Sequence, residues 1–178
     1  YMPNLGFFKK IQSSDIFVFL DDVQFTKDSF GNRNQIKTNF GPEWITVPLN
    51  RPVFEKKINE ISISYETNWI KEHCNKIFEN YKSTPYFSSY WYEIEKILNY
   101  KHKLLIQLNF ELIKYFIKTL DIHTKTIKSS ELSITKIKTE RLIEICLKLN
   151  AKCYISGIGG KDYLDESLFE NAKIKLIY

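Results

Sequence analysis

Two adjacent carboxylates, Asp21 and Asp22, directly follow an uninterrupted apolar run at residues 16–20. Five β-branched, aromatic or aliphatic residues in a row predict a strand that is buried on both faces. Ligands of open α/β sheets bind outside the carboxyl ends of the strands, so these acids are candidate catalytic groups, acting as a base or holding a substrate amine. The structural alternative is that Asp22 caps a turn and Asp21 is solvated.

A polar stretch at residues 24–37 comes next and offers amide and cationic side chains to a ligand. The candidate substrate-binding residues here are Gln24, Asn32, Arg33 and Asn34. Arg33 suits a carboxylate or a phosphate, because its planar donors can engage two oxygens together. Basic surface loops are also common in proteins that bind nothing there. This stretch is therefore a candidate binding site only in combination with the other motifs.

A glycine-rich loop follows a second predicted strand, at residues 152–156. Its candidate ligand-binding residues are Gly157, Gly159, Gly160, Lys161 and Asp162. Backbone amides without a neighbouring Cβ can approach an anion closely, and a lysine can neutralise it. The loop lacks the Gly-Lys-Ser/Thr ending of a P-loop and the full dinucleotide fingerprint. The alternative is a tight turn in which the glycines supply positive φ angles and Asp165 caps the last helix.

One cation, Arg141, falls in the first turn of a predicted helix at residues 137–149. Thr139 is interpreted as the N-cap of that helix and Glu140 as an acid that complements the helix dipole. Arg141 opposes the dipole, which favours a partner such as an acid or a ligand phosphate. We therefore add Arg141 to the candidate binding residues.

Composition narrows the classes of function. The chain has 178 residues, is 43% hydrophobic, and carries 26 basic against 21 acidic residues, which gives a net charge of +5. This charge is too diffuse to indicate a nucleic-acid partner. Three cysteines without Cys-x-x-Cys spacing favour a reducing, cytoplasmic compartment, and three isolated histidines predict no metal site. The sequence contains no apolar span of about 20 residues, so we expect no membrane insertion.

The periodicity predicts a mixed α/β order of elements. Strands are expected near 16–20, 44–48, 58–64, 123–128, 152–156 and 173–178, and helices near 5–14, 68–81, 86–99, 103–120, 137–149 and 165–171. The predicted fold class is α/β, with a Rossmann-like, mostly parallel sheet and a helical insertion or subdomain at 68–120 within one domain spanning 1–178. The chain opens on a Pro-containing loop rather than on Met, and closes on a strand-like run. We therefore expect further polypeptide at both ends.

The strands at 16–20 and 152–156 are expected to lie parallel in one sheet. Their carboxyl ends would then meet at one rim, and the acid pair, the polar stretch and the glycine-rich loop would share one cleft.

Several ordered motifs resemble the WbqC-like protein family over essentially the whole chain. They are Tyr1–Phe8, Phe17–Phe25, Asn32–Lys37, Trp44–Pro48, Thr139–Leu142 and Ser156–Leu164. The resemblance implies a bacterial cytoplasmic protein associated with the biosynthesis of surface polysaccharide, such as O-antigen, or of glycolipid. It supplies neither an established reaction nor a cofactor.

A fainter similarity links the opening of the chain to pantothenate synthetase-like nucleotidylyltransferases. It consists of a Pro-x-x-Gly turn at Pro3–Gly6 that opens a helix, and an apolar strand ending near Val23–Phe25. The paired histidines of those enzymes have no counterpart around Asn4–Phe8, so only a Rossmann-like topology carries over.

The sequence thus supports two hypotheses. In the first, the protein is a transferase that moves an acyl or aminoacyl group to an amino sugar or nucleotide sugar, with the acid pair acting as base and the two loops holding the ligand. In the second, it is a non-catalytic module that binds a sugar nucleotide or glycolipid within a biosynthetic complex.

Overall fold

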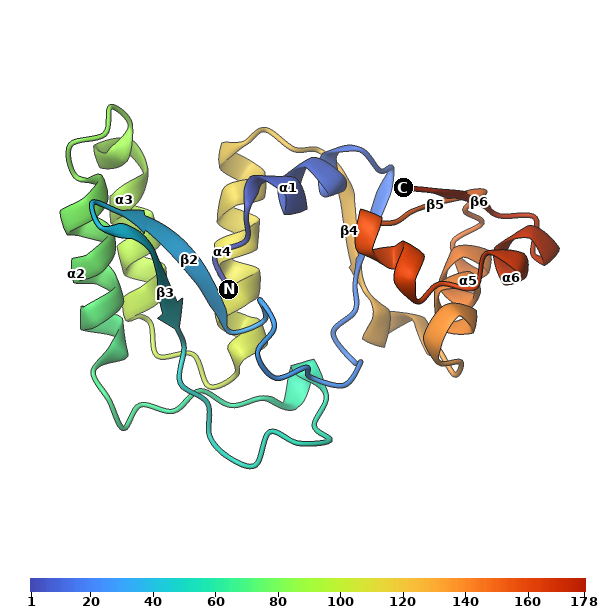
Figure 1. Cartoon of the computed structure of the whole chain (residues 1–178), viewed down its shortest axis with the longest axis horizontal. Helices are drawn as coiled ribbons and strands as arrows, with labels where there is room; N and C mark the ends of the chain where they lie inside the picture. Colours follow the sequence, from blue (N-terminus) through green and yellow to red (C-terminus); the bar gives the residue numbers. More distant parts are fainter. The chain divides into compact units, whose positions relative to one another are not determined.

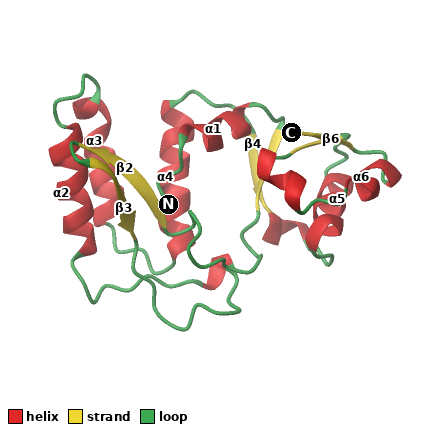
Figure 2. Cartoon of the chain, viewed as in Figure 1, coloured by secondary structure: helices red, strands yellow, loops and turns green.

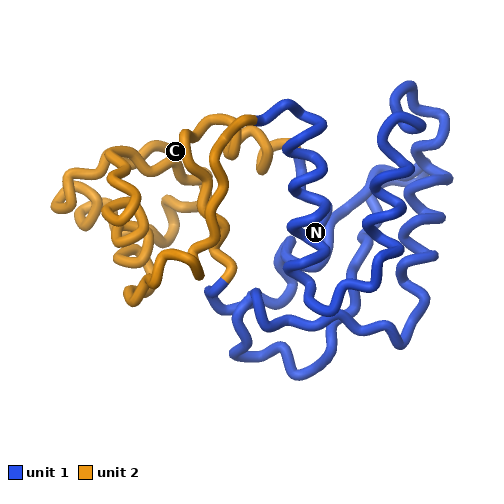
Figure 3. The backbone as a smooth tube through the Cα atoms, turned by 180° about the vertical axis from the view of Figure 1, so that it is seen from behind, with its two compact units in different colours: residues 1–4, 22–122 blue, residues 5–21, 123–178 orange.

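A computed structural model describes residues 1–178 and divides into two compact units (Figure 3). Unit 1 comprises Tyr1–Asn4 and Asp22–Ile122, and unit 2 comprises Leu5–Asp21 and His123–Tyr178. The expected helical segment 68–120 falls entirely in unit 1, whereas the glycine-rich loop belongs to unit 2.

Unit 1 contains three helices and one antiparallel hairpin (Figure 1). The helices are α2 (Trp69–Tyr81), α3 (Phe87–Asn99) and α4 (Leu105–Thr119), and the hairpin strands are β2 (Arg33–Thr38) and β3 (Gly41–Thr46). A short 3₁₀ segment, η1, spans Ile58–Glu60.

Helix α4 forms because its apolar residues recur at helical spacing. Leu105, Leu108 and Leu112 lie on one face and are almost completely buried. They join Trp69 of α2 and Leu98 of α3 in the core of unit 1. Burial of this face, more than helix propensity, stabilises the helices.

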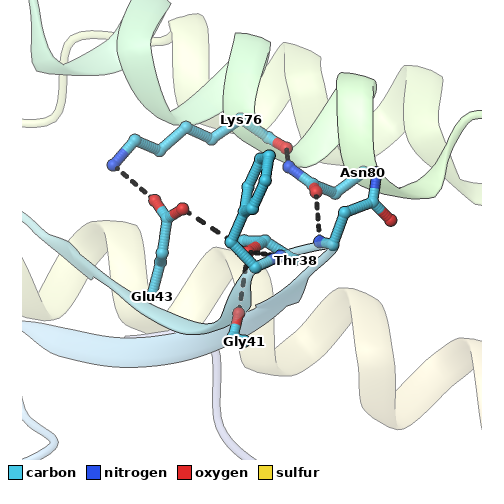
Figure 4. Close-up of polar contacts among 7 residues, drawn as sticks. Thr38, Gly41, Glu43, Lys76 and Asn80 are labelled. Atoms are coloured by element: carbon cyan, nitrogen blue, oxygen red, sulfur yellow. Dashed lines mark hydrogen bonds and ion pairs between the residues drawn. The ribbon is translucent and has the colours of Figure 1, made fainter.

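The tip of the hairpin is held against α2 by polar contacts (Figure 4). Lys76 forms an ion pair of 3.1 Å with Glu43, and the side-chain oxygen of Asn80 accepts the backbone N–H of residue 39. Within the turn, the Thr38 hydroxyl donates to the carbonyl oxygen of Gly41 at 2.7 Å. Gly41 has a φ of 113°, a conformation that L side chains rarely adopt, so the turn requires glycine there.

Unit 2 contains two small parallel sheets and three helices (Figure 2). The helices are α1 (Leu5–Gln12), α5 (Lys138–Lys148) and α6 (Glu166–Asn171), and the strands are β1 (Ile16–Phe19), β4 (Lys125–Lys128), β5 (Cys153–Ile155) and β6 (Lys175–Ile177). Strand β1 pairs with β4, and β5 pairs with β6. Two 3₁₀ segments, η2 (Ser129–Leu132) and η3 (Ile158–Asp162), follow β4 and β5.

The core of unit 2 is separate from that of unit 1. It consists of buried residues from α5, from α6 and from the segments beside them: Leu142, Cys146, Leu164, Phe169 and Ile174. Each unit thus has its own apolar centre.

All six expected helices are confirmed, each within two residues of its expected bounds. The strands expected near 16–20, 123–128, 152–156 and 173–178 are also confirmed. The strand expected at 58–64 is wrong: η1 occupies its start, and only isolated bridges form at Ser62 and Ile63. The expectation that 16–20 and 152–156 share one sheet is wrong as well, because β1 and β5 belong to different two-stranded sheets. The molecule is a mixed helix and strand protein with small parallel sheets.

Candidate functional site

Asp21 is buried at the end of β1 and its carboxylate is fully engaged. One oxygen accepts the backbone N–H of Ser130 at 2.9 Å and the hydroxyl of Ser129 at 3.2 Å. The other accepts the hydroxyl of Ser130 at 2.6 Å. Asp21 therefore fastens β1 to η2, and the alternative in which Asp21 is solvated is wrong.

The second acid, Asp22, is half-buried and begins the long segment of unit 1. Gln24 is exposed, and its backbone forms an antiparallel bridge with Lys57. Neither residue belongs to a helix or a named strand: Asp22 lies in the turn that follows β1, and Gln24 lies at the isolated bridge. Of the acid pair, only Asp22 lies in unit 1.

Arg33 begins β2 and is held by its own turn. Its guanidinium makes an ion pair of 3.3 Å with the Asp28 carboxylate, donates to the Asp28 carbonyl at 2.7 Å, and stacks 4.5 Å from the centre of the Trp44 ring. These contacts fix the orientation of the guanidinium plane. An incoming carboxylate would have to share or replace Asp28.

Asn32 and Asn34 use their amides to hold backbone. The Asn32 amide donates to the carbonyl of Val47 at 2.9 Å, and the Asn34 amide donates to the carbonyl of Met2. The side-chain oxygen of Asn34 accepts the backbone N–H of Gln35 at 2.8 Å. These two asparagines brace the polar stretch, which gives them a structural role whether or not a ligand also reaches them.

The glycine-rich loop folds as η3, and its glycines have ordinary backbone angles. None of the three has a positive φ, so the alternative of a turn that needs positive φ is wrong. A Cβ on Gly160 would lie 2.1 Å from the Ser156 hydroxyl oxygen, so packing explains that glycine. Around Gly157 and Gly159 nothing lies within 4 Å of the site of a Cβ, and both are exposed. Neither folding nor packing requires glycine at these two positions.

Lys161 and Asp162 complete the loop and are both exposed. The Lys161 ammonium lies 5.1 Å from the centre of the Tyr178 ring, a cation–π contact that leaves the charge at the surface. Lys161, two residues after Gly159 in the sequence, thus supplies a positive charge to the same loop as the open backbone at Gly157 and Gly159.

Arg141 is half-buried in the first turn of α5. The N-cap of this helix is Ile137, so the interpretation of Thr139 as the N-cap is wrong. Thr139 is instead a buried helix residue whose hydroxyl accepts the backbone N–H of Asp165 at 3.2 Å. Asp165 does cap α6, as expected, by accepting the Ser167 N–H.

The predicted site residues fall into two groups. Unit 2 holds Asp21, Arg141 and the loop Gly157–Asp162, and unit 1 holds Asp22, Gln24 and Asn32–Asn34. A single cleft shared by both groups stays a prediction.

Two features escaped the sequence analysis. A cleft of about 700 Å³ lies within unit 2, lined by residues of both β1 and β5. In unit 1, the Tyr1 hydroxyl hydrogen-bonds to Nδ1 of buried His73 at 3.0 Å, and burial lowers the pKa of His73 to about 4. The apolar runs of the sequence predicted strands β1 and β5 but not the cleft that these strands line. No local sequence pattern predicts the contact between Tyr1 and His73, because the two residues are far apart in the chain.

No three or more His, Cys, Asp or Glu side chains gather where they could hold a metal ion. No helix has both the length and the apolar character needed to cross a membrane.

The fold and the loops define a small mixed α/β protein with an open glycine-rich backbone. The chain belongs to the WbqC-like protein family, whose model matches residues 1–178. It is 34% identical over 180 residues to a Mycobacterium tuberculosis protein named Uncharacterized protein Rv1507c, and the match covers 100% of this chain and 78% of that protein. No solved structure matches the chain.

Proposed function

We propose that this protein takes part in the biosynthesis of bacterial surface polysaccharide or glycolipid, in the cytoplasm, and binds an amino sugar or nucleotide sugar. Membership of the WbqC-like family supports the biological setting. The observation that carries the ligand class is the exposed backbone at Gly157 and Gly159, which no conformational or packing need explains. Peptide N–H groups without a side chain in the way suit a phosphate or a carboxylate.

The proposed reaction is transfer of an acyl or aminoacyl group to the amine of the sugar. The amine nitrogen forms a bond to the carbonyl carbon of an activated acyl donor, the leaving group departs with its electron pair, and the amine proton passes to a carboxylate base. Asp22 is the better base of the acid pair, because the Asp21 oxygens already accept three hydrogen bonds. Arg33 and Arg141 are assigned to the charged groups of donor or acceptor.

Binding to the glycine-rich loop is tested with nucleotide sugars by calorimetry. Gly159→Ala should weaken binding at least tenfold, because the new methyl group occupies the space through which the ligand approaches. Lys161→Ala should weaken binding and reduce its salt dependence. The matched control is Lys136→Ala, an exposed lysine of the same unit outside the loop, which should bind like wild type. Unchanged affinity in both loop variants contradicts the proposed site.

The rival function is a non-catalytic module that binds the same ligands. It is favoured by one observation: Asp21, Asn32, Arg33 and Asn34 all use their polar groups on the protein itself. Incubation with nucleotide sugars and activated acyl donors, followed by mass spectrometry, separates the two functions. Turnover that is lost in Asp22→Asn supports the transferase, and binding without turnover supports the module.

A further inference from the structure

The carboxyl ends of β5 and β6 lie side by side, and the glycine-rich loop starts at this rim of the small sheet. The two strands are parallel, with Ile155 paired to Ile177. The backbone N–H of Ser156 then donates to the carbonyl oxygen of Ile177 at 2.8 Å, so the pairing continues to the start of the loop. Ligands of parallel sheets bind just outside such carboxyl ends. Tyr178, which follows β6, is therefore a neighbour of the loop.

Tyr178 joins Lys161 of the loop to Glu166 of α6. The Lys161 ammonium lies 5.1 Å from the centre of the Tyr178 ring, and the Tyr178 hydroxyl donates to Oε1 of Glu166 at 2.7 Å. This hydrogen bond raises the pKa of Tyr178 to about 12, and a smaller contribution from Tyr163 indicates that the Tyr163 hydroxyl also lies close. One cation, one carboxylate and two phenol rings thus gather beside the exposed glycine backbone of the loop.

Only part of the Glu166 carboxylate is needed to hold Tyr178. Oε1 accepts the Tyr178 hydroxyl, whereas no protein group donates to Oε2, and the side chain is exposed. A carboxylate this close to Lys161 would repel an anion that filled the whole site. It suits a ligand in which the anion is joined to a hydroxyl group, because an ionised carboxylate only accepts hydrogen bonds.

Two large apolar side chains of the same region are left in solvent. Ile158 is 75% exposed and Tyr163 is 73% exposed. The backbone N–H of Tyr163 donates to the carbonyl oxygen of Gly160 at 3.2 Å, so this residue is held by its backbone and not by packing of its ring. An exposed aromatic ring is a surface on which a planar base can stack, and such stacking tolerates every base.

We propose that the ligand of the glycine-rich loop is a nucleoside diphosphate sugar built on ribose, and that Glu166 and Tyr163 recognise its nucleoside part. Lys161 pairs with the diphosphate, Oε2 of Glu166 accepts a hydrogen bond from a ribose hydroxyl, and the ring of Tyr163 stacks on the base. This assignment rests on the proposed function, because it places the ligand at the same loop. It selects nucleotide sugars over free amino sugars, which carry neither a phosphate nor a base.

The contribution of the nucleoside is measured by calorimetry. The probes are the diphosphates of adenosine, uridine, guanosine and cytidine, with inorganic pyrophosphate as the probe that lacks a nucleoside. The best nucleoside diphosphate should bind about tenfold more tightly than pyrophosphate. Tyr163→Ala should remove most of this advantage and leave pyrophosphate binding unchanged. Its matched control is Tyr163→Phe, which keeps the ring and should bind like wild type.

The contact with ribose is measured with the 2′,3′-dideoxy form of the best nucleoside diphosphate. Wild type should bind this form about tenfold more weakly than the ribose form, and Glu166→Ala should bind both forms equally. A carboxylate that acts only through its charge gives a different result, because its removal would strengthen the binding of both forms alike.

Two control variants separate the ribose contact from the other features of Glu166. Glu170→Ala removes an exposed acid from the same helix and should keep the preference for ribose. Tyr178→Phe removes the hydrogen bond to Glu166 but leaves the carboxylate and the ring, so it should also keep that preference.

Two outcomes overturn the inference and leave the proposed function standing. One is that pyrophosphate binds as tightly as every nucleoside diphosphate, with both weakened by Gly159→Ala. The other is that wild type binds the ribose and dideoxy forms equally. If Gly159→Ala and Lys161→Ala change the binding of none of these probes, the loop is not the site, and the proposed function and the inference fail together.

Discussion

At the scale of single residues, Asp21 combines burial with a full set of hydrogen-bond donors. Its carboxylate is buried and accepts three hydrogen bonds from Ser129 and Ser130. Asp21→Ala leaves buried donors without an acceptor, and we expect a loss of about 3 kcal/mol in the free energy of unfolding. Asp21→Asn keeps one acceptor oxygen, so its loss should be about half as large. Urea denaturation measures both.

The control for this prediction is Asp15→Ala, an exposed acid just before β1. It should change the free energy of unfolding by less than about 0.5 kcal/mol. If Asp21→Ala is as mild as this control, the carboxylate does not fasten β1 to η2, and a catalytic role for Asp21 regains weight.

His73 makes the stability of unit 1 depend on pH. Burial, with a smaller contribution from Lys76, lowers its pKa from 6.5 to about 4. Below pH 6.5 the unfolded chain therefore binds a proton that the folded chain does not, so stability falls as the pH drops from 6.5 towards 4. The loss reaches up to roughly 3 kcal/mol at the lower end.

Urea denaturation followed by tryptophan fluorescence at pH 7, 6 and 5 checks this dependence. His73→Leu should flatten it more than His102→Leu, although burial lowers the pKa of His102 too. A wild-type stability that is constant between pH 7 and 5 contradicts the assignment.

At the scale of elements, hydrophobic periodicity predicted the helices and most of the apolar strands. The stripe of Leu105, Leu108 and Leu112 predicts α4, and the apolar run at 16–20 predicts β1. Strand β2 was missed because Arg33–Thr38 is mostly polar and is held by its hairpin partner and by α2. The pattern also could not show which strands pair, since pairing depends on contacts between distant residues.

The candidate site was predictable only as a list of polar groups. That Asp21 would meet Ser129 and Ser130, more than a hundred residues away, leaves no local trace in the sequence. The glycine-rich loop is evident in the sequence, but only the three-dimensional structure distinguishes Gly160, which packing requires, from Gly157 and Gly159.

This separation gives a prediction for the loop. Gly160→Ala should destabilise unit 2 by about 1–3 kcal/mol, because its methyl group would overlap the Ser156 hydroxyl and press on Leu164. Gly157→Ala and Gly159→Ala should leave stability unchanged or raise it by up to about 1 kcal/mol, since the alanine lowers the entropy of the unfolded chain. Thermal unfolding of the three variants side by side measures the contrast. Equal losses at all three positions would show that η3 packs differently.

At the scale of the whole molecule, two separate cores raise the question of whether the two units unfold independently. The core of unit 1 contains Trp69 and Trp91, and Trp44 also belongs to that unit. Because the chain has three tryptophans, its tryptophan fluorescence reports unit 1 alone. Hydrogen exchange at α5 and β6 reports unit 2.

A pair of matched core variants tests whether the units unfold independently. Phe169→Ala in unit 2 and Leu108→Ala in unit 1 each remove a side chain that is about 1% exposed, which costs about 3–5 kcal/mol and about 2–5 kcal/mol respectively. If each core supports only its own unit, Phe169→Ala should accelerate exchange at α5 and β6 and leave the urea midpoint of tryptophan fluorescence unchanged. Leu108→Ala should lower that midpoint and spare exchange in unit 2. A fluorescence midpoint that falls equally in both variants would mean that the chain unfolds as one cooperative domain, as its sequence alone suggests.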